Sequence, residues 1–502
     1  MRLWANLSRF ATHIPLHVSY LQADTPSGVS VLKKTSLASD TTSSAAAANR
    51  TRRRSKQAQQ EWPVPVPSRA ELACAFAQAL DLAEGKQPGH AARVCYIALN
   101  LAELIELSET ERRALYFAAL LHDAGAAPAT AAVCRELNIA EETIFGGAPG
   151  VSAEEAALQI APFNAEQMLE AIRSHPKHGA SVAETLGFDT EVQAAIIAHH
   201  ERWDGEGYPN RQQGEEIPVA GRLIAAADLI EALISTDPNP LAARRNVASG
   251  LAEHAGGVLS IELAQEARTL MTSDSFWLGL HQATLPQELA ASLPEDPAAA
   301  ERSPVDFHTF AATFAALGDA KGEHTVSHSG RTAEIADDIA AALSFTDGRR
   351  ELLRVAATAH DVGLLGVPAR VIAKPDILSL TEMEVMRKHP TYSQLVIDAL
   401  PGLEEIGRWV GAHHERPDGK GYPEMLDANT TPIEARIVTL ADTYVALTSV
   451  RPYRKALSHK DAVKVLQGGA GSQLDKKLVK LFCSLQMPAR SSQTAQRSGR
   501  TR

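Results

Sequence analysis

The segment Gly411-Ala-His-His-Glu-Arg-Pro-Asp-Gly-Lys-Gly-Tyr-Pro423 places two adjacent histidines, a carboxylate and a glycine-interrupted loop within thirteen residues. The segment Ile197-Ala-His-His-Glu-Arg-Trp-Asp-Gly-Glu-Gly-Tyr-Pro209 repeats it almost residue for residue. Self-similarity of this length indicates an internal duplication. The chain is therefore predicted to contain two copies of one structural unit.

The sequence intervals between candidate metal ligands agree in the two copies. Three intervals recur, namely 32 residues (His90 to His122, His328 to His360), 24 residues (His175 to His199, His389 to His413) and 29 residues (His199 to Asp228, His413 to Asp442). Only the step from His122 to His175, 53 residues against 29 in the second copy, differs. The first copy thus has an insertion of 24 residues, near 127–150, which is rich in Ala and Gly and is expected to form a surface loop.

Apolar residues recur at three- and four-residue spacing through both copies, and strand signals are nearly absent, which predicts an all-α protein. Helices are expected near 111–121 and 329–343, and Ser108 with Glu111 three positions later predicts a helix start. The predicted domains are a disordered extension (1–67), the first unit with its insertion (68–290), a linker (291–305), the second unit (306–488) and a disordered tail (489–502).

The charge of the chain is uneven. Residues 1–60 hold nine Lys and Arg against two acids, whereas residues 61–488 hold 36 basic and 58 acidic residues. This balance gives no basic stripe for duplex nucleic acid. An anionic substrate would therefore need local positive charge, from a metal ion or a few arginines.

The cysteines and the hydropathy exclude other classes. Four cysteines without paired spacing indicate neither a disulfide framework nor a thiolate metal site. No run of 18 apolar residues predicts a membrane span, and the first residues lack a signal-peptide pattern, so a cytoplasmic location is expected.

A His-Asp pair ends an apolar segment in each copy, at His122-Asp123 and His360-Asp361. A buried carboxylate beside an imidazole is costly unless a positive charge neutralises it. A divalent ion does so, and a His/Asp set without thiolate suits iron, manganese or zinc. A single histidine on an apolar face is more often a core residue, but recurrence of the whole set in both copies favours metal binding.

Further paired motifs surround these ligands: His90 with Arg93 and His328 with Arg331; His175-Pro176 and His389-Pro390; Ala227-Asp228 and Ala441-Asp442; and, in the second copy alone, Arg451-Pro-Tyr-Arg454. With the His-Asp pairs and the Asp-Gly-x-Gly-Tyr-Pro loops, both copies resemble the HD-GYP subgroup of the HD-domain metal-dependent phosphohydrolases.

The resemblance implies two tandem HD-type helical bundles, each holding about two divalent ions, with iron or manganese favoured. It implies hydrolysis of a cyclic dinucleotide, cyclic di-GMP first, by a metal-bound hydroxide that attacks phosphorus. The implied ligands are His90, His122, Asp123, His175, His199, His200 and Asp228 in the first copy and His328, His360, Asp361, His389, His413, His414 and Asp442 in the second. His122, Asp123, His360 and Asp361 would be catalytic. Substrate contacts would come from Arg331, Asp418, Gly419, Gly421, Tyr422, Arg451 and Arg454.

Several positions depart from the family pattern. The lysine usual three residues after the Asp is Ala126 in one copy and Leu364 in the other. A glutamate that binds a third ion in some members is Lys86 or His324 here, which favours two ions. Two alternatives stay open: an HD phosphohydrolase for another nucleotide, and a non-catalytic nucleotide-binding signalling protein. A signalling partner or a homodimer also stays open.

The two copies are expected to be unequal. Only the second has Arg451 and Arg454, so it is predicted to carry most of the turnover. The alternative is that Arg244-Arg245 of the first copy reach the same phosphate.

Overall fold

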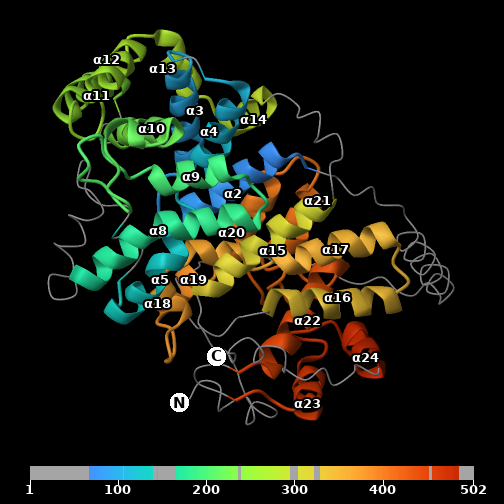
Figure 1. Ribbon diagram of the computed structural model, residues 1–502. Coiled ribbons are helices and arrows are strands. Elements are labelled where there is room, and N and C mark those ends of the chain that lie inside the picture. Colours follow the sequence, from blue (N-terminus) through green and yellow to red (C-terminus); the bar gives the residue numbers. More distant parts are fainter. Residues whose placement is uncertain are drawn as a thin grey trace, which may run out of the picture.

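The structure is a computed structural model that describes residues 67–105, 107–139, 144, 165–235, 239–293, 304–321, 328–450 and 455–485. Within these ranges it contains α-helices and two short 3₁₀ helices but no β-strand, which confirms the all-α prediction (Figure 1). The predicted extension 1–67, apart from residue 67, and the predicted tail 489–502 lie outside the described residues. In the described parts of the chain, every helix is too short or too polar to cross a lipid bilayer.

The N-terminal half, residues 67–293, contains eleven described α-helices and one 3₁₀ helix. They are α2 (Arg69–Glu84), α3 (His90–Ala102), α4 (Glu109–Leu121), α5 (Ala126–Leu137), α8 (Ala165–Thr185), α9 (Thr190–Ala198), η1 (Gly214–Glu216), α10 (Val219–Ser235), α11 (Pro240–His254), α12 (Ile261–Leu270), α13 (Asp274–Leu280) and α14 (Leu285–Ser292).

The C-terminal half, residues 304–485, repeats the order of the helices that carry or flank the candidate ligands, but within the described residues it has no counterpart of α13 and α14. Its elements are α15 (Pro304–Lys321), α16 (His328–Ala342), α17 (Asp347–Ala359), η3 (Val362–Gly366), α18 (Ala369–Ile372), α19 (Leu380–Met386), α20 (His389–Asp398), α21 (Glu404–Gly411), α22 (Ile433–Thr448), α23 (His459–Gly469) and α24 (Lys476–Ser484). Even the isolated bridges recur, Ala255 with Leu259 and Ala470 with Leu474.

Local sequence signals explain where the helices begin. The Ser108 hydroxyl accepts a hydrogen bond from the Glu111 amide, and the Glu111 carboxylate accepts one from the Ser108 amide, as the sequence predicts. Ser379 and Glu382 make the same capping box at α19. The first cap fixes the start of α4, which His122 follows directly, and the second fixes the start of α19, which precedes His389 of α20.

The prediction of a surface loop near 127–150 is wrong for the first part of that range. Residues 126–137 form helix α5, in which Val133 and Cys134 are buried against Met168 and Ile172 of α8. The segment is rich in alanine, which has the highest intrinsic helix propensity, and its apolar spacing gives a face that can be buried. Residues 140–143 and 145–164 lie outside the described residues.

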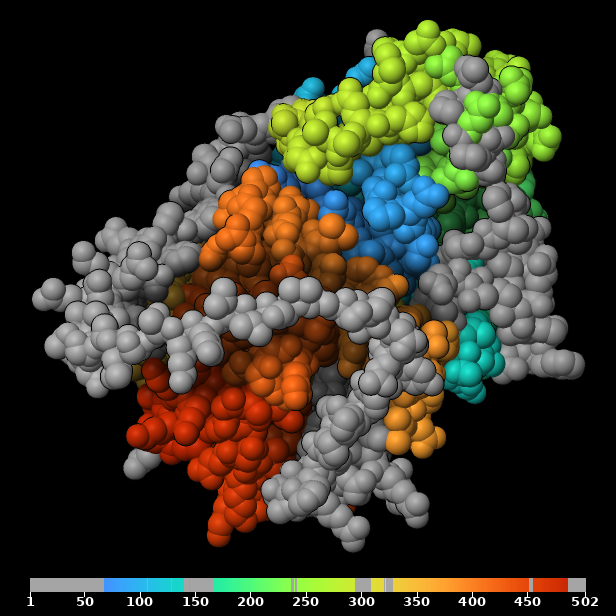
Figure 2. Space-filling model, turned by 180° about the vertical axis from the view of Figure 1, so that it is seen from behind, coloured from blue at the N-terminus to red at the C-terminus, as the bar shows by residue number. Residues whose placement is uncertain are grey.

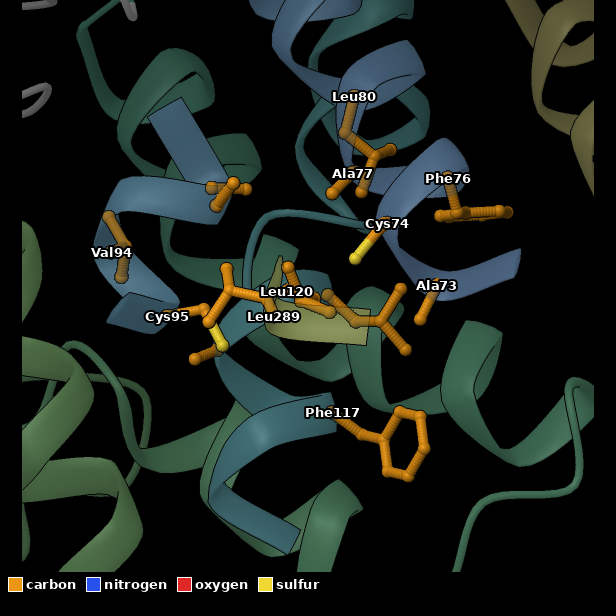
Figure 3. Packing of buried hydrophobic residues seen from close by; sticks show 14 of the residues in the cluster. Ala73, Cys74, Phe76, Ala77, Leu80, Val94, Cys95, Phe117, Leu120 and Leu289 are labelled. Carbon is orange, nitrogen blue, oxygen red and sulfur yellow. The ribbon is translucent and has the colours of Figure 1, made fainter. Parts of the chain in front are cut away.

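Helix α2 lies between the two halves and is buried nearly all round. Cys74 faces α4, where its Sγ lies 3.5 Å from the Tyr116 hydroxyl. Phe76 points to the opposite side, where its ring centroid lies 4.4 Å from that of Phe314 in α15 (Figure 3). A helix with apolar residues on every side is expected to be enclosed by other elements. One hydrophobic core therefore continues from the N-terminal half into α15, α17, η3, α20 and α21 of the C-terminal half.

Further contacts join the halves. The Arg135 guanidinium of α5 donates a 2.9 Å hydrogen bond to the Lys321 carbonyl at the end of α15. In Figure 2 the blue surface of the first helices adjoins the orange surface of the C-terminal half. The predicted linker 291–305 is described only at its ends, where α14 stops at Ser292 and α15 begins at Pro304. The domain boundaries remain predictions, but the halves share one core.

The shared core predicts coupled unfolding. Phe314→Ala removes a side chain that is 3% exposed, and we expect a loss of about 3–5 kcal/mol of unfolding free energy. Because Phe314 packs on α2, hydrogen exchange in urea should show α4 and α17 losing protection at the same lowered denaturant concentration. Leu278→Ala, at a 73% exposed position, is the control and should change little. Loss of protection in α17 alone would contradict a continuous core.

Candidate metal centres

Helix ends bring the predicted ligands of the C-terminal half together. His328 and His389 begin α16 and α20, while His360 and Asp361 follow α17. Two groups result, each with ligand atoms within 4.8 Å of one another: Asp361, His389, His413 and His414 in one, and His328, His360 and Asp361 in the other. Asp361 belongs to both groups. Asp442 of α22 also faces the centre, with Oδ1 2.9 Å from His328 Nε2.

A glycine allows this convergence. A Cβ on Gly363 would lie 2.1 Å from the His389 carbonyl oxygen, so only glycine lets α20 approach the turn after Asp361. Gly125 has the same role, since its Cβ would lie 2.0 Å from the His175 carbonyl oxygen. The glycine two residues after each His-Asp pair therefore sets the distance between the second and third ligands.

The imidazoles are oriented as metal ligands. Nδ1 of His389 and Nδ1 of His413 lie 2.8 Å and 2.5 Å from the carbonyl oxygens of Met386 and Val410. A carbonyl only accepts, so each Nδ1 carries the proton and each Nε2 of a neutral ring has a bare lone pair. These two Nε2 atoms lie 3.2 Å apart and face each other. Two facing lone pairs repel unless a cation lies between them, which is the arrangement of ligands oriented by backbone carbonyls.

The charges in this centre also suit a cation. Burial disfavours the ionised Asp361 carboxylate, but His360 and the other imidazoles outweigh burial and hold its pKa well below the usual range. Burial lowers the pKa of His389 to about 4, so this ring is neutral at pH 7. Burial also opposes charge on His360, yet Asp361 raises the pKa of His360 to about 9. A proton thus supplies the positive charge that a bound divalent ion would replace.

Orphaned atoms support the same interpretation. Among the described residues, buried His360 Nε2 has no hydrogen-bond partner, although it faces Asp361 Oδ2 at 3.3 Å. The donor set is nitrogen and oxygen only, which fits iron, manganese or zinc. The residues of the C-terminal half therefore fit a divalent metal centre.

The Asp-Gly-x-Gly-Tyr-Pro loop is fixed by a residue whose role the sequence analysis left unassigned. The Glu415 carboxylate accepts hydrogen bonds from the amides of Glu424 (2.7 Å) and Leu426 (2.9 Å), and so holds the loop rather than an ion. A Cβ on Gly421 would lie 2.5 Å from the Arg416 amide nitrogen. Tyr422 then stacks on the predicted ligand His414, with ring centroids 4.9 Å apart. Glu201 accepts the equivalent bonds in the N-terminal half.

The predicted substrate residues fall into three groups. Asp418 is bound within the loop by Arg416, at 2.6 Å, and Gly419 forms the loop tip with a φ of 69°. Arg331 lies one turn after His328, with its guanidinium 3.4 Å from the hydroxyls of Ser449 and Thr448. Arg451 and Arg454 lie outside the described residues.

Arg387 is a further candidate residue that the sequence motifs did not indicate. Its guanidinium lies 5.5 Å from the centroid of the Tyr422 ring, beside the ligands. The available signal was its position two residues before His389, which Arg173 repeats before His175.

The N-terminal half repeats the ligand geometry. One group contains Asp123, His175, His199 and His200, and the other contains His90, His122 and Asp123. His175 Nε2 and His199 Nε2 face each other at 3.3 Å, and their Nδ1 atoms donate to the Ile172 and Ile196 carbonyls, each at 2.6 Å. Asp228 lies 3.5 Å from His90 Nε2. All seven predicted ligands therefore converge in this half as well.

Two charged residues distinguish the N-terminal centre. Lys86 Nζ lies 2.5 Å from Asp123 Oδ2 and 3.0 Å from Glu84 Oε2. Burial disfavours the ammonium, but Asp123 and Glu84 outweigh it and hold the pKa of Lys86 well above its usual range. Glu231 binds Arg93 at 2.6 Å and His90 Nδ1 at 2.8 Å. The position equivalent to Glu231 is Val445 in the C-terminal half.

Arg244 and Arg245 of the first copy, the suggested counterparts of Arg451 and Arg454, do not both lie at this centre. Arg244 forms an ion pair with Asp274 at 2.8 Å and lies over the Trp277 ring. This placement disfavours the alternative in which Arg244-Arg245 bind the substrate phosphate.

Comparison with known proteins agrees with this geometry. The HD domain family model matches residues 163–253 and 314–478. The 3'3'-cGAMP-specific phosphodiesterase 3 of Vibrio cholerae is 28% identical over 429 residues, which cover 81% of this chain and 92% of that protein. A cyclic di-GMP phosphodiesterase response regulator of Xanthomonas campestris is 36% identical over 154 residues, 30% of this chain and 40% of that protein.

A solved structure shares the arrangement of both halves. The crystal structure of a cyclic GMP-AMP-specific phosphodiesterase of Vibrio cholerae superposes with a TM-score of 0.58 and 26% identity, covering 82% of this chain and 96% of that one. With two converged ligand sets and two Gly-Tyr-Pro loops, the chain belongs to the HD domain family, as a tandem member of the HD-GYP type.

Proposed function

We propose that this chain is a metal-dependent phosphodiesterase that hydrolyses a 3'3'-linked cyclic dinucleotide at its C-terminal centre. The observation that carries the proposal is the facing Nε2 pair of His389 and His413, beside an ionised Asp361. Such a buried set is stable only around a cation, and it lies next to arginines that can bind phosphate.

The substrate proposed first is 3'3'-cGAMP rather than cyclic di-GMP. A relative named for 3'3'-cGAMP aligns with 81% of this chain, whereas a relative named for cyclic di-GMP aligns with 30%. Cyclic di-GMP, which the resemblance placed first, is therefore the second candidate. Both substrates carry two phosphodiesters and would meet the same groups at the centre.

The seven predicted ligands of the C-terminal half would hold about two ions, and Asp361 belongs to both ligand groups. When bound, divalent ions supply an activated water at neutral pH and positive charge for the phosphoryl oxygens. The chain's own residues do the rest. Backbone carbonyls fix the His389 and His413 tautomers, and the Glu415-anchored loop places Tyr422 against His414.

Arg331 and Arg387 would orient the substrate. Within the described residues Arg331 forms no ion pair and contacts only hydroxyls, so its charge is available to a phosphate. Arg387 is exposed beside Tyr422. Burial and the nearby Asp361 and Asp442 raise the pKa of Tyr422, so its hydroxyl stays protonated and can donate a hydrogen bond.

Substrate choice is tested directly. Purified, manganese-loaded protein should hydrolyse 3'3'-cGAMP with a higher kcat/KM than cyclic di-GMP, measured by separating the linear products. A preference for cyclic di-GMP would reverse the order of the two. Tight binding of either nucleotide without turnover would favour the signalling-protein alternative, and turnover of a different nucleotide alone would favour the other HD phosphohydrolase activity.

The location of the activity is tested with a matched pair of variants. Asp361→Asn should lower kcat at least about 100-fold, because it removes the carboxylate shared by both ligand groups. Asp123→Asn should lower kcat by less than about tenfold, because the N-terminal centre does not turn over substrate. Circular dichroism checks that both are folded. The assignment is reversed if Asp123→Asn is inactive while Asp361→Asn keeps most of its activity.

Substitutions of Arg331 and Arg93, which follow the first histidine of each copy by three residues, should differ in their effect on kcat/KM. Arg331→Met removes an available phosphate contact, so kcat/KM should fall about 10- to 100-fold, as for a charge-assisted hydrogen bond. Arg93→Met should leave kcat/KM nearly unchanged, because Glu231 already neutralises Arg93. Equal effects of the two substitutions would show that both halves bind substrate.

A further inference from the structure

Lys86 brings an ammonium group into the interior of the N-terminal centre. It follows the end of α2, and its side chain is 17% exposed. Its Nζ lies 3.0 Å from His90 Nε2 as well as 2.5 Å from Asp123 Oδ2. Both of these atoms are predicted metal-binding atoms, and Glu84 Oε2 holds the ammonium from a third side at 3.0 Å.

The two oxygens of the shared aspartate define which position Lys86 takes. In the C-terminal half, Asp361 Oδ1 faces His389 at 3.3 Å, and Oδ2 faces His360 at 3.3 Å. In the N-terminal half, Asp123 Oδ1 faces His175 at 3.5 Å, and Oδ2 faces His122 at 3.0 Å. Lys86 binds Oδ2, so it lies on the side of His90 and His122 and leaves the side of His175, His199 and His200 open.

We propose that the Lys86 ammonium replaces one divalent ion in the N-terminal centre, at the position formed by His90, His122 and Asp123 Oδ2. The N-terminal half then binds one ion fewer than the C-terminal half, and its remaining ion is held by Asp123 Oδ1, His175, His199 and His200. This departs from the expectation of two ions in each half. It concerns ion content and holds whichever nucleotide is hydrolysed.

An ion and the ammonium exclude each other at this position. A transition-metal ion bound to His90 Nε2 and Asp123 Oδ2 would lie about 2.0–2.2 Å from each atom, which is the space that Nζ fills. Two cations so close would also repel each other strongly in a buried site. Withdrawal of Lys86 would leave the buried Asp123 carboxylate without this cation.

The hydrogen bonds of His90 fit this replacement. Glu231 accepts a hydrogen bond from His90 Nδ1 at 2.8 Å, so the lone pair of a neutral His90 ring is on Nε2, which accepts from Lys86. The chain from Lys86 through His90 to Glu231 is therefore complete without an ion. The equivalent ring in the C-terminal half, His328, has a buried Nδ1 with no partner among the described residues.

The inferred role of the filled position is to anchor α2. Glu84 is the last residue of α2, and the same helix packs on η3 and α20 of the C-terminal half. An ammonium that is part of the chain holds this end of α2 at any metal concentration, whereas an ion would dissociate. The N-terminal centre then fixes the helix on which the active half rests.

Metal content tests the replacement. Full-length wild type, Lys86→Met and Lys86→Arg are loaded with Mn²⁺, desalted and measured by elemental analysis. Lys86→Met should bind about one more ion per chain than wild type, because it keeps the length of the side chain but removes the charge. Lys86→Arg keeps the cation and should gain none. A folded Lys86→Met protein that gains no manganese overturns the proposal.

A second pair of variants leaves Lys86 in place. Asp361→Asn should remove about two ions per chain and Asp123→Asn about one, if one of four positions is filled by the ammonium. Loss of two ions from a folded Asp123→Asn protein would contradict the proposal. In addition, Mn²⁺ should raise the melting temperature of Lys86→Met more than that of wild type, because the ion would restore the charge that the substitution removed.

Discussion

The constraint on which this structure depends is the burial of an aspartate among imidazoles. Asp361 and Asp123 each lie between histidines whose Nδ1 atoms are bound to backbone carbonyls, so bare Nε2 lone pairs and a carboxylate meet in the protein interior. Such a set is stable only if positive charge enters it. The two halves meet this requirement differently: the C-terminal half has a complete set for divalent ions, and the N-terminal half has Lys86 as a built-in cation.

The helices are arranged to meet this requirement at their ends. His122 and His360 follow α4 and α17 directly, and the Gly125 and Gly363 turns let α8 and α20 approach within backbone contact. A helix end points a side chain inward with its backbone already fixed by the cap and the core. The ligands are thereby oriented before any ion binds, which reduces the reorganisation that binding would require.

Duplication followed by divergence explains why two similar centres differ in charge. Glu231 neutralises Arg93 and engages His90, where the C-terminal half has Val445 and leaves Arg331 available. The family model matches the C-terminal half from residue 314 but the N-terminal half only from residue 163. The segment that carries Lys86 and His90 thus lies outside the residues that the family model matches. This half contributes α2 to the common core.

The sequence by itself determined the helical class and the duplication, and it predicted fourteen ligands that the structure brings close together, because ligand intervals and capping residues are local features of the sequence. Ser108 and Glu111 predicted a helix start that the structure contains. The prediction of a loop at residues 126–137 was wrong, because the burial of this alanine-rich segment depends on its packing against α8.

Only the tertiary structure decided how the two centres differ. Lys86 and Glu231 are 145 residues apart, and although the sequence marks Lys86 as a departure from the family's glutamate, nothing in it connects either residue with His90. Lys86 reaches His90 from the end of α2, and Glu231 reaches it from α10, at distances that only the folded structure sets. The apolar residues on every side of α2 could likewise be assigned to both halves only when Phe76 was seen against Phe314. Local sequence motifs identify the candidate ligands. The charge around each candidate ligand depends on which distant side chains are brought into contact with it by packing.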